Sequence, residues 1–205
     1  MVLTTKGQRT ERAIVDQTIE IIEQRGEAAV RVQDLAAETG VAVSSIYYFF
    51  KDREGLIAAA QVERYSRSLI ETMAQFEGAL SSAQSRDDLK KVVRGMNRLA
   101  WTYERAPYRL QRLNVVGSTM GRPSLKEHIA AIQDEMVSVL VRHLHPAQEK
   151  GWIRPDVDPA ALAAWMIGNV LQRALIELGE SQVKGKEWNK IAEEAVFVML
   201  FDDKP

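Results

Sequence analysis

Apolar residues recur at helical spacing through almost the whole of this 205-residue chain. The first stripe contains Ile14, Ile21 and Ile22, and similar stripes follow it along the sequence. No segment of useful length shows the strict alternation of apolar and polar residues that is typical of a half-buried strand. The pattern therefore predicts an all-α protein with roughly nine or ten helices.

Capping residues and prolines predict where several helices begin and end. Asp158 followed by Pro159 combines a good N-cap residue with proline at the first helical position, which predicts a helix that runs to about Leu178. Pro107 is expected to interrupt one helix, and Pro146 is expected to kink or end another.

Composition excludes several classes of protein. The chain has 27 Lys+Arg and 28 Asp+Glu, so any nucleic-acid surface must come from local placement of charge. The absence of cysteine excludes disulfides and thiolate metal sites, and three histidines, two of them flanking Leu144, do not suggest a metal site. No apolar run reaches the roughly 18 residues of a membrane span, and no signal peptide is evident. We expect a cytoplasmic protein with no cofactor and no membrane attachment.

Motifs of common enzymes are absent from the sequence. There is no dinucleotide-binding, phosphate-loop or nucleophile-elbow pattern, and Asp202-Asp203 is interpreted as a solvated chain end. We therefore predict that the protein is not an enzyme. A small α-helical enzyme stays a less favoured alternative, which would need acid, base or metal ligands converging on a cavity.

Residues 32–50 predict two short helices that meet at a tight turn. Gly40 suits a turn with positive φ, and the small Ala36 lets the second helix approach the first. The side chains expected to point inward are Leu35, Val41, Ile46 and Phe50. The side chains left outside are mostly small or hydroxylated, which suits entry into a DNA major groove. They are Val43, Ser44, Ser45, Tyr47 and Tyr48.

The stretch LAAETGVAVSSIYYFFKDREGL, residues 35–56, resembles the N-terminal DNA-binding region of TetR-family transcriptional repressors. The helix spacing, the turn glycine, the tyrosine pair and the basic residues that open the next helix all coincide. The resemblance covers residues 10–56, about a quarter of the chain. It implies a three-helix DNA-binding domain over residues 1–53 and an effector-binding and dimerisation domain over residues 54–205. Apolar periodicity predicts a long helix from Asp52 to about Leu80 at the start of the second domain.

The resemblance also implies a homodimer that binds a palindromic operator duplex and is released by a small-molecule effector. By position, base contacts would come from Gln33, Val43, Ser44, Ser45 and Tyr47. Phosphate contacts would come from Arg31, Tyr48, Lys51 and Arg53. A helical hairpin packed only for stability is the alternative for residues 32–50, and a solvated helix start is the alternative for Lys51 and Arg53.

Charge near the N-terminus predicts modest non-specific binding. Residues 1–53 contain seven basic and eight acidic side chains, with Lys6, Arg9 and Arg12 clustered in an N-terminal arm. Few phosphates would be neutralised per monomer, so the salt dependence of DNA binding is expected to be shallow.

Two helices near the C-terminus carry stripes of small and large apolar residues. The resemblance implies that these helices pair with their symmetry mates in a four-helix bundle, in which each stripe is self-complementary. The stripe residues are Ala161, Ala164, Gly168, Leu171, Leu175, Ile191, Ala195, Val198 and Met199. Ordinary core packing is the alternative for each residue taken singly.

Polar groups at helical spacing beside apolar ones predict an effector pocket. Such a site needs an apolar lining with a few placed donors, and we expect a largely hydrophobic effector with a polar head near Arg112. The candidate residues are Asn97, Trp101, Tyr108, Arg112, Met120, Met136, Trp165, Asn169 and Gln172. Each of them is also compatible with a place in the core or on the surface.

A second class of function stays open at this stage. A helical adaptor or scaffold whose helix-turn-helix no longer binds DNA would share the same pattern. Replacement of Tyr47 and Lys51 by alanine distinguishes a DNA-binding regulator from such an adaptor. Only the regulator would then lose duplex binding while its fold and dimer persist.

Overall fold

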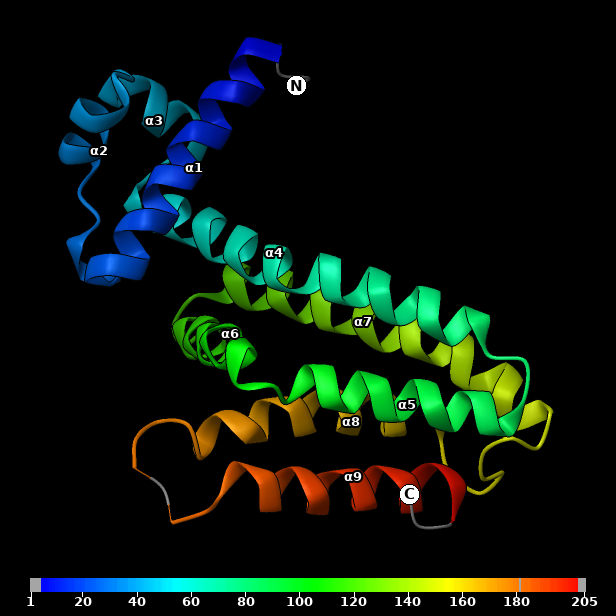
Figure 1. The fold of residues 1–205 in the computed structure, drawn as a ribbon. Helices are drawn as coiled ribbons and strands as arrows, with labels where there is room; N and C mark the ends of the chain where they lie inside the picture. The colour runs from blue at the N-terminus through cyan, green and yellow to red at the C-terminus, as the bar shows by residue number, and fades with distance from the viewer. Residues whose placement is uncertain (1–4, 181, 203–205) are drawn as a thin grey trace. The chain divides into compact units, whose positions relative to one another are not determined.

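The computed structural model describes residues 5–180 and 182–202, and this part of the chain contains helices and no strand. The predicted all-α fold is confirmed. The helices are α1 (Thr5–Arg25), η1 (Glu27–Ala29), α2 (Val32–Thr39), α3 (Val43–Phe50), α4 (Arg53–Ser82), α5 (Arg86–Ala100), η2 (Tyr103–Arg105), α6 (Ala106–Ser118), α7 (Pro123–Glu149), α8 (Pro159–Leu175) and α9 (Gly185–Phe201), as Figure 1 shows.

The chain forms two compact units, which are described separately. The first holds the residues up to Arg67 together with Ser118–Ile129, and the second holds Ser68–Gly117 and the residues from Ala130 onward. Helices α4 and α7 contribute residues to both units. The boundary after residue 53 stays a prediction, and the compact unit that contains the N-terminal helices also includes the first part of α4.

The first unit is held together by an aliphatic core. Helix α1 packs against both α2 and α3, and the three helices lie together in Figure 1. The buried core residues are Ile14, Val15, Ile19, Ile21, Ile22, Val30, Val32, Leu35, Ile46, Phe50, Leu56, Ile57 and Ala60. Burial of this continuous apolar surface is the main force that fixes α3 on the unit.

In the second unit, α9 lies beside both α5 and α8 (Figure 1). Within the described residues of this unit, two helix starts have side-chain caps. Ser85 Oγ accepts from the Asp88 N–H at the start of α5, at 3.1 Å. Asp158 Oδ1 accepts from the Ala161 N–H at 2.7 Å, so the start predicted from Asp158-Pro159 is confirmed.

Both prolines, Pro107 and Pro146, lie inside helices of the structure. Pro146 does not end its helix, because α7 continues to Glu149 and the Lys150 N–H still bonds the Pro146 carbonyl. The helix before Pro107 ends at Ala100, and the η2 turn separates it from α6. Pro107 lies instead in the first turn of α6, where its missing N–H removes no helical hydrogen bond.

No helix in the described part of the chain is both long and apolar enough to cross a membrane. Of the Asp202-Asp203 pair, Asp202 is exposed and Asp203 lies outside the described residues.

Candidate nucleic-acid interface and ligand cavity

Helices α2 and α3 form a helix-turn-helix with Gly40 at the turn. Gly40 has φ 68° and ψ 15°, a left-handed conformation that a β-carbon would penalise. Leu35, Ile46 and Phe50 are buried in the core shared with α1, and Val41 packs against that core. The predicted inward positions are therefore confirmed, and they fix how α3 is presented.

The outer face of α3 is uncharged and carries hydroxyl groups. Tyr47 and Tyr48 are 42% and 61% exposed, which is high for large aromatic side chains. Ser44 and, on α2, Gln33 are also exposed, and the remaining predicted base-contacting residues, Val43 and Ser45, are half-buried. Hydroxyl groups can donate to and accept from base edges, so this face is chemically suited to a major groove.

Basic side chains lie near both ends of the helix-turn-helix. Arg31 is exposed at the N-cap of α2 and makes no capping hydrogen bond, as expected for a side chain without an acceptor. Lys51 follows α3, is exposed, and has φ 65° and ψ −54°, outside the regions that L-residues favour. The cationic residues predicted in an N-terminal arm lie on α1 instead, and all are exposed: Lys6, Arg9 and Arg12.

Arg53 has an internal role that the sequence did not suggest. Its Nε donates to the Val30 carbonyl at 2.8 Å, and its Nη2 donates to the Glu27 carbonyl at 2.6 Å. Its Nη1 donates to Glu54 at 2.7 Å. Arg53 therefore holds η1 against the start of α4, and a phosphate would have to compete with these bonds.

A polar cluster in the first unit is centred on Glu27. The carboxylate accepts from Gln61 of α4, from the Ser118 hydroxyl at the end of α6, and from Arg122 Nη1 at 2.7 Å. Arg122 Nε also donates to Glu54 at 2.9 Å. Four segments of the first unit, η1, the start of α4, the end of α6 and the turn before α7, are thereby joined.

Electrostatics favours the ionised form of Glu27. Burial raises the pKa of Glu27, but hydrogen bonds from Ser118, Gln61 and Arg122 and the charge of Arg122 outweigh burial, so the pKa lies below its ordinary value of 4.5. The carboxylate is therefore charged at neutral pH, as the network requires.

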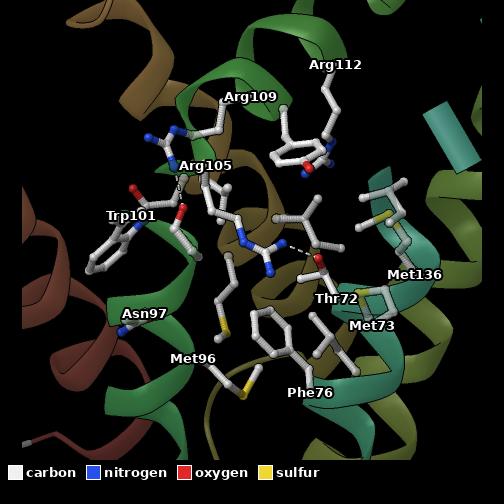
Figure 2. A pocket seen from close by; sticks show the side chains of 18 of the residues that line it. Thr72, Met73, Phe76, Met96, Asn97, Trp101, Arg105, Arg109, Arg112 and Met136 are labelled. Carbon is white, nitrogen blue, oxygen red and sulfur yellow. Dashed lines mark hydrogen bonds between the residues drawn. The ribbon is translucent and has the colours of Figure 1, made fainter. Parts of the chain in front are cut away.

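The second unit contains a cavity of about 90 Å³. Helices α4, α5, α6, α7, α8 and α9 and the η2 turn all contribute to its wall, and Figure 2 shows many of the side chains. Its lining residues are Leu69, Thr72, Met73, Phe76, Met96, Asn97, Ala100, Trp101, Arg105, Tyr108, Arg109, Arg112, Met136, Leu140, Met166, Ile167, Asn169, Val170 and Val196. Most of these side chains are apolar, which is typical of small-molecule sites.

Two-thirds of the residues predicted for an effector pocket line this cavity. They are Asn97, Trp101, Tyr108, Arg112, Met136 and Asn169. The structure does not bring the other three to it. Met120 is 85% exposed and belongs to the first unit, beyond the end of α6. Gln172 is exposed on α8, and Trp165 is half-buried on α8 outside the lining.

Sequence reasoning missed two cationic lining residues, Arg105 and Arg109. Figure 2 shows Arg105 reaching into the cavity, where it donates a hydrogen bond to the Thr72 hydroxyl. Arg105, Arg109 and Arg112 are spaced by four and then three residues. That spacing places three cations on one helical face, and it is the signal that could have found them.

Arg109 belongs to a buried charge cluster. Its Nε donates to Glu177 Oε2 at 2.9 Å, and Arg173 Nη1 lies 3.2 Å from Glu177 Oε1. The pKa of Arg173 lies below its ordinary value, mainly because the group is buried. The Glu177 carboxylate raises this pKa, and the positive charge of Arg109 lowers it further. Two guanidinium groups thus share one carboxylate.

The apolar stripes of α8 and α9 are partly open to solvent in the single chain. Leu175 and Ile191 are 62% and 68% exposed. Ala161, Ala164, Val198 and Met199 are exposed as well, and Gly168, Leu171 and Ala195 are half-buried. No group of three or more His, Asp or Glu side chains that could hold a metal ion occurs within the described residues.

The fold and these surfaces define the class of protein as a helix-turn-helix protein with a second, helical unit that encloses a cavity. Residues 14–60 match the family model described as bacterial regulatory proteins, tetR family. An uncharacterised HTH-type transcriptional regulator from the dhlA 5′ region of Xanthobacter autotrophicus is 28% identical over 86 residues, which span 42% of this chain and 42% of that relative.

Solved structures show the same fold over nearly the whole chain. A proposed TetR-family transcriptional regulator from Rhodococcus sp. is 24% identical and has a TM-score of 0.69, over 93% of this chain and 98% of that one. A proposed transcriptional regulator from Saccharomonospora viridis, in complex with choline, is 16% identical and has a TM-score of 0.66, over 93% of this chain and 96% of that one. The predicted resemblance of the N-terminal region to TetR-family regulators is confirmed over residues 14–60.

Proposed function

We propose that the protein is a sequence-specific transcriptional regulator whose α3 enters the major groove of an operator duplex. The observation that carries this proposal is the open, uncharged face of α3, with Tyr47 and Tyr48 exposed while Leu35 and Ile46 are buried. A hairpin packed only for stability gives no reason for two adjacent exposed tyrosines.

In this proposal, base contacts come from the outer face of the helix-turn-helix, and phosphate contacts surround them. The base-contacting residues are Gln33, Val43, Ser44, Ser45 and Tyr47. The phosphate-contacting residues are Arg31, Tyr48, Lys51 and Arg53. Lys51 is the strongest phosphate candidate because it is exposed, whereas Arg53 is bonded to the Val30 and Glu27 carbonyls.

Selection from a randomised duplex pool tests the proposal. Wild-type protein is expected to enrich a palindrome with half-sites roughly 34–36 Å apart. Tyr47→Ala is expected to abolish the enrichment, and Tyr103→Ala, which changes an 81% exposed tyrosine of the second unit, is the matched control. Folded wild-type protein that enriches no sequence, or equal enrichment by Tyr47→Ala, would contradict the proposal.

We also propose a homodimer formed through the exposed stripes of α8 and α9. The support is the exposure of large apolar side chains there, which a symmetric interface would bury. Ile191→Glu is expected to convert the dimer to monomer in sedimentation experiments. Ile70→Glu is the control, because Ile70 on α4 is 65% exposed, close to the 68% of Ile191. A monomeric wild type, or a dimer that survives Ile191→Glu, would overturn this assignment.

The regulator is further proposed to be a repressor that a small molecule releases from DNA by binding in the cavity of the second unit. A relative with the same fold is described in complex with the small molecule choline, which supports a ligand site in this architecture. Thermal-stability screening of metabolites identifies a ligand, and calorimetry then compares its affinity with and without operator. By linkage the operator must weaken ligand binding as much as the ligand weakens operator binding, so equal affinities would refute the scheme.

A further inference from the structure

The cavity wall contains a cation whose charge has no carboxylate partner within the described residues. The Arg105 guanidinium donates to the Thr72 hydroxyl and lies 6.0 Å from the centre of the Tyr108 ring. No ion pair to a described Asp or Glu side chain involves Arg105, in contrast to Arg109, which is paired with Glu177. Figure 2 shows the Arg105 guanidinium among Thr72, Phe76 and Met96, at the middle of the lining.

Polar groups of the lining favour an acceptor over a donor. Among the residues that the structure describes, the lining includes three arginines and neither Asp nor Glu. Asn169 is buried, and its Nδ2 has no hydrogen-bond acceptor among the residues that the structure describes. A ligand with a negative charge and spare lone pairs would satisfy these groups, whereas a cationic ligand would find no carboxylate among the described lining residues.

The rest of the wall is apolar and deformable. Met73, Phe76, Met96, Met136 and Met166 come from four different helices. Methionine adapts its shape easily, so these side chains can move to enlarge a cavity of about 90 Å³. That volume is well below the roughly 300–1,000 Å³ of sites for drug-sized ligands, which favours a short apolar chain.

We propose that this cavity binds a small amphipathic carboxylate, with the carboxylate on Arg105 and Thr72 and a short apolar tail among the methionines and Phe76. This inference rests on the proposed ligand site of the regulator and gives that ligand its chemical class. A guanidinium binds a carboxylate through two parallel hydrogen bonds, and the surrounding apolar wall strengthens them by excluding water.

Calorimetric titration of the full chain with three six-carbon probes tests the charge preference. Hexanoate, 1-hexanol and hexylamine have similar tails and differ in head group. Wild-type protein is expected to bind hexanoate at least about tenfold more tightly than either of the others, a factor worth about 1.4 kcal/mol. Tighter binding of hexylamine or 1-hexanol, or no binding of hexanoate by the folded protein, would overturn the proposal.

Variants then locate the carboxylate. Arg105→Met keeps a long side chain and removes the charge, so it is expected to lose the preference for hexanoate over 1-hexanol. Arg98→Met on the exposed face of α5 is the matched control and is expected to bind like wild type. A hexanoate preference that survives Arg105→Met in a protein that still binds 1-hexanol would refute the assigned contact.

Duplex binding is measured separately for wild type and Arg105→Met without any probe. Because Arg105 belongs to the second unit, both proteins are expected to retain operator binding. Loss of hexanoate binding with intact operator binding would count against the ligand class alone. Absence of operator binding in both proteins would count against the proposed regulator, whatever the cavity binds.

Discussion

Glu27 and Arg122 are 95 residues apart in the chain, and their Oε2 and Nη1 atoms are 2.7 Å apart in the first unit. The same guanidinium reaches Glu54 at the start of α4, and the same carboxylate accepts from Gln61. This pairing makes the turn before α7 part of the unit that carries the helix-turn-helix. A shift at the end of α6 or the start of α7 would therefore move η1, the turn that precedes the helix-turn-helix, through these hydrogen bonds.

Glu27→Gln is expected to destabilise the protein by about 1.5–3 kcal/mol at pH 7, the usual range for hydrogen bonds to a charged group. Glu127→Gln, which changes an exposed carboxylate on α7, is the control and is expected to change stability little. Urea unfolding measures both. A loss no larger than that of Glu127→Gln would contradict the role given to the cluster.

The cost of Glu27→Gln should also depend on pH. Because the folded pKa of Glu27 lies below its ordinary value of 4.5, the stabilisation is complete above about pH 4.5 and is lost as the pH falls through the lowered folded value. The difference in unfolding free energy between wild type and variant is thus expected to be constant from pH 7 to about pH 5 and to shrink below it. A difference that grows on acidification would show that the sign is wrong.

Local signals in the sequence were sufficient for the helix-turn-helix. The conformation of Gly40 depends on its neighbours along the chain, and the burial of Leu35 and Ile46 follows from helical periodicity. The N-cap at Asp158 is equally local. Such features are set by residues within about one helical turn, so they can be predicted from the amino-acid sequence.

Pairings between distant residues were not predictable in the same way. Glu27 with Arg122, and Arg109 with Glu177, join segments 95 and 68 residues apart, and periodicity along the chain does not say which distant side chains meet. Arg53 shows the same limit, since its place beside Lys51 suggested a phosphate contact, whereas its guanidinium donates to the Val30 and Glu27 carbonyls. The cavity was therefore predicted in part, and its central cation was missed.

Gly55→Ala is expected to destabilise the first unit although alanine favours helices. A β-carbon at Gly55 would lie 2.1 Å from the Phe50 carbonyl oxygen, so the junction of α3 and α4 would have to shift. Gly78→Ala in the same helix is the control, because no atom lies within 4 Å of its β-carbon, and a gain of about 0.5–1 kcal/mol is expected. Thermal unfolding compares the two, and a stabilised Gly55→Ala would contradict the close approach.

Lys51→Gly is expected to separate stability from DNA binding. Glycine relieves the φ of 65° at Lys51, so stability should rise by roughly 1 kcal/mol. Loss of the exposed cation should weaken duplex binding about equally for all sequences and lower the salt slope by about one per monomer. Thermal melts and salt-dependent binding curves measure both effects.

Lys51→Arg is the control for that variant, because it keeps the charge and the backbone conformation. It is expected to match wild type in stability and in salt slope. If Lys51→Gly is stabilised but its salt slope is unchanged, Lys51 does not contact phosphate. If it is destabilised, the strain assigned to its backbone is absent.

Glu177→Gln is expected to be among the most destabilising single changes, because it leaves Arg109 and Arg173 buried together without a carboxylate. Removal of one partner from a buried ion pair costs about 3–5 kcal/mol, and here one carboxylate serves two cations. Glu193→Gln breaks the more exposed pair with Arg94 and should cost about 1 kcal/mol or less. The double variant Glu177→Gln/Arg173→Met should recover part of the loss, because it removes one of the two uncompensated charges. Urea unfolding measures the three variants. Equal losses of unfolding free energy in Glu177→Gln and Glu193→Gln, or no recovery in the double variant, would mean that Glu177 does not neutralise Arg109 and Arg173.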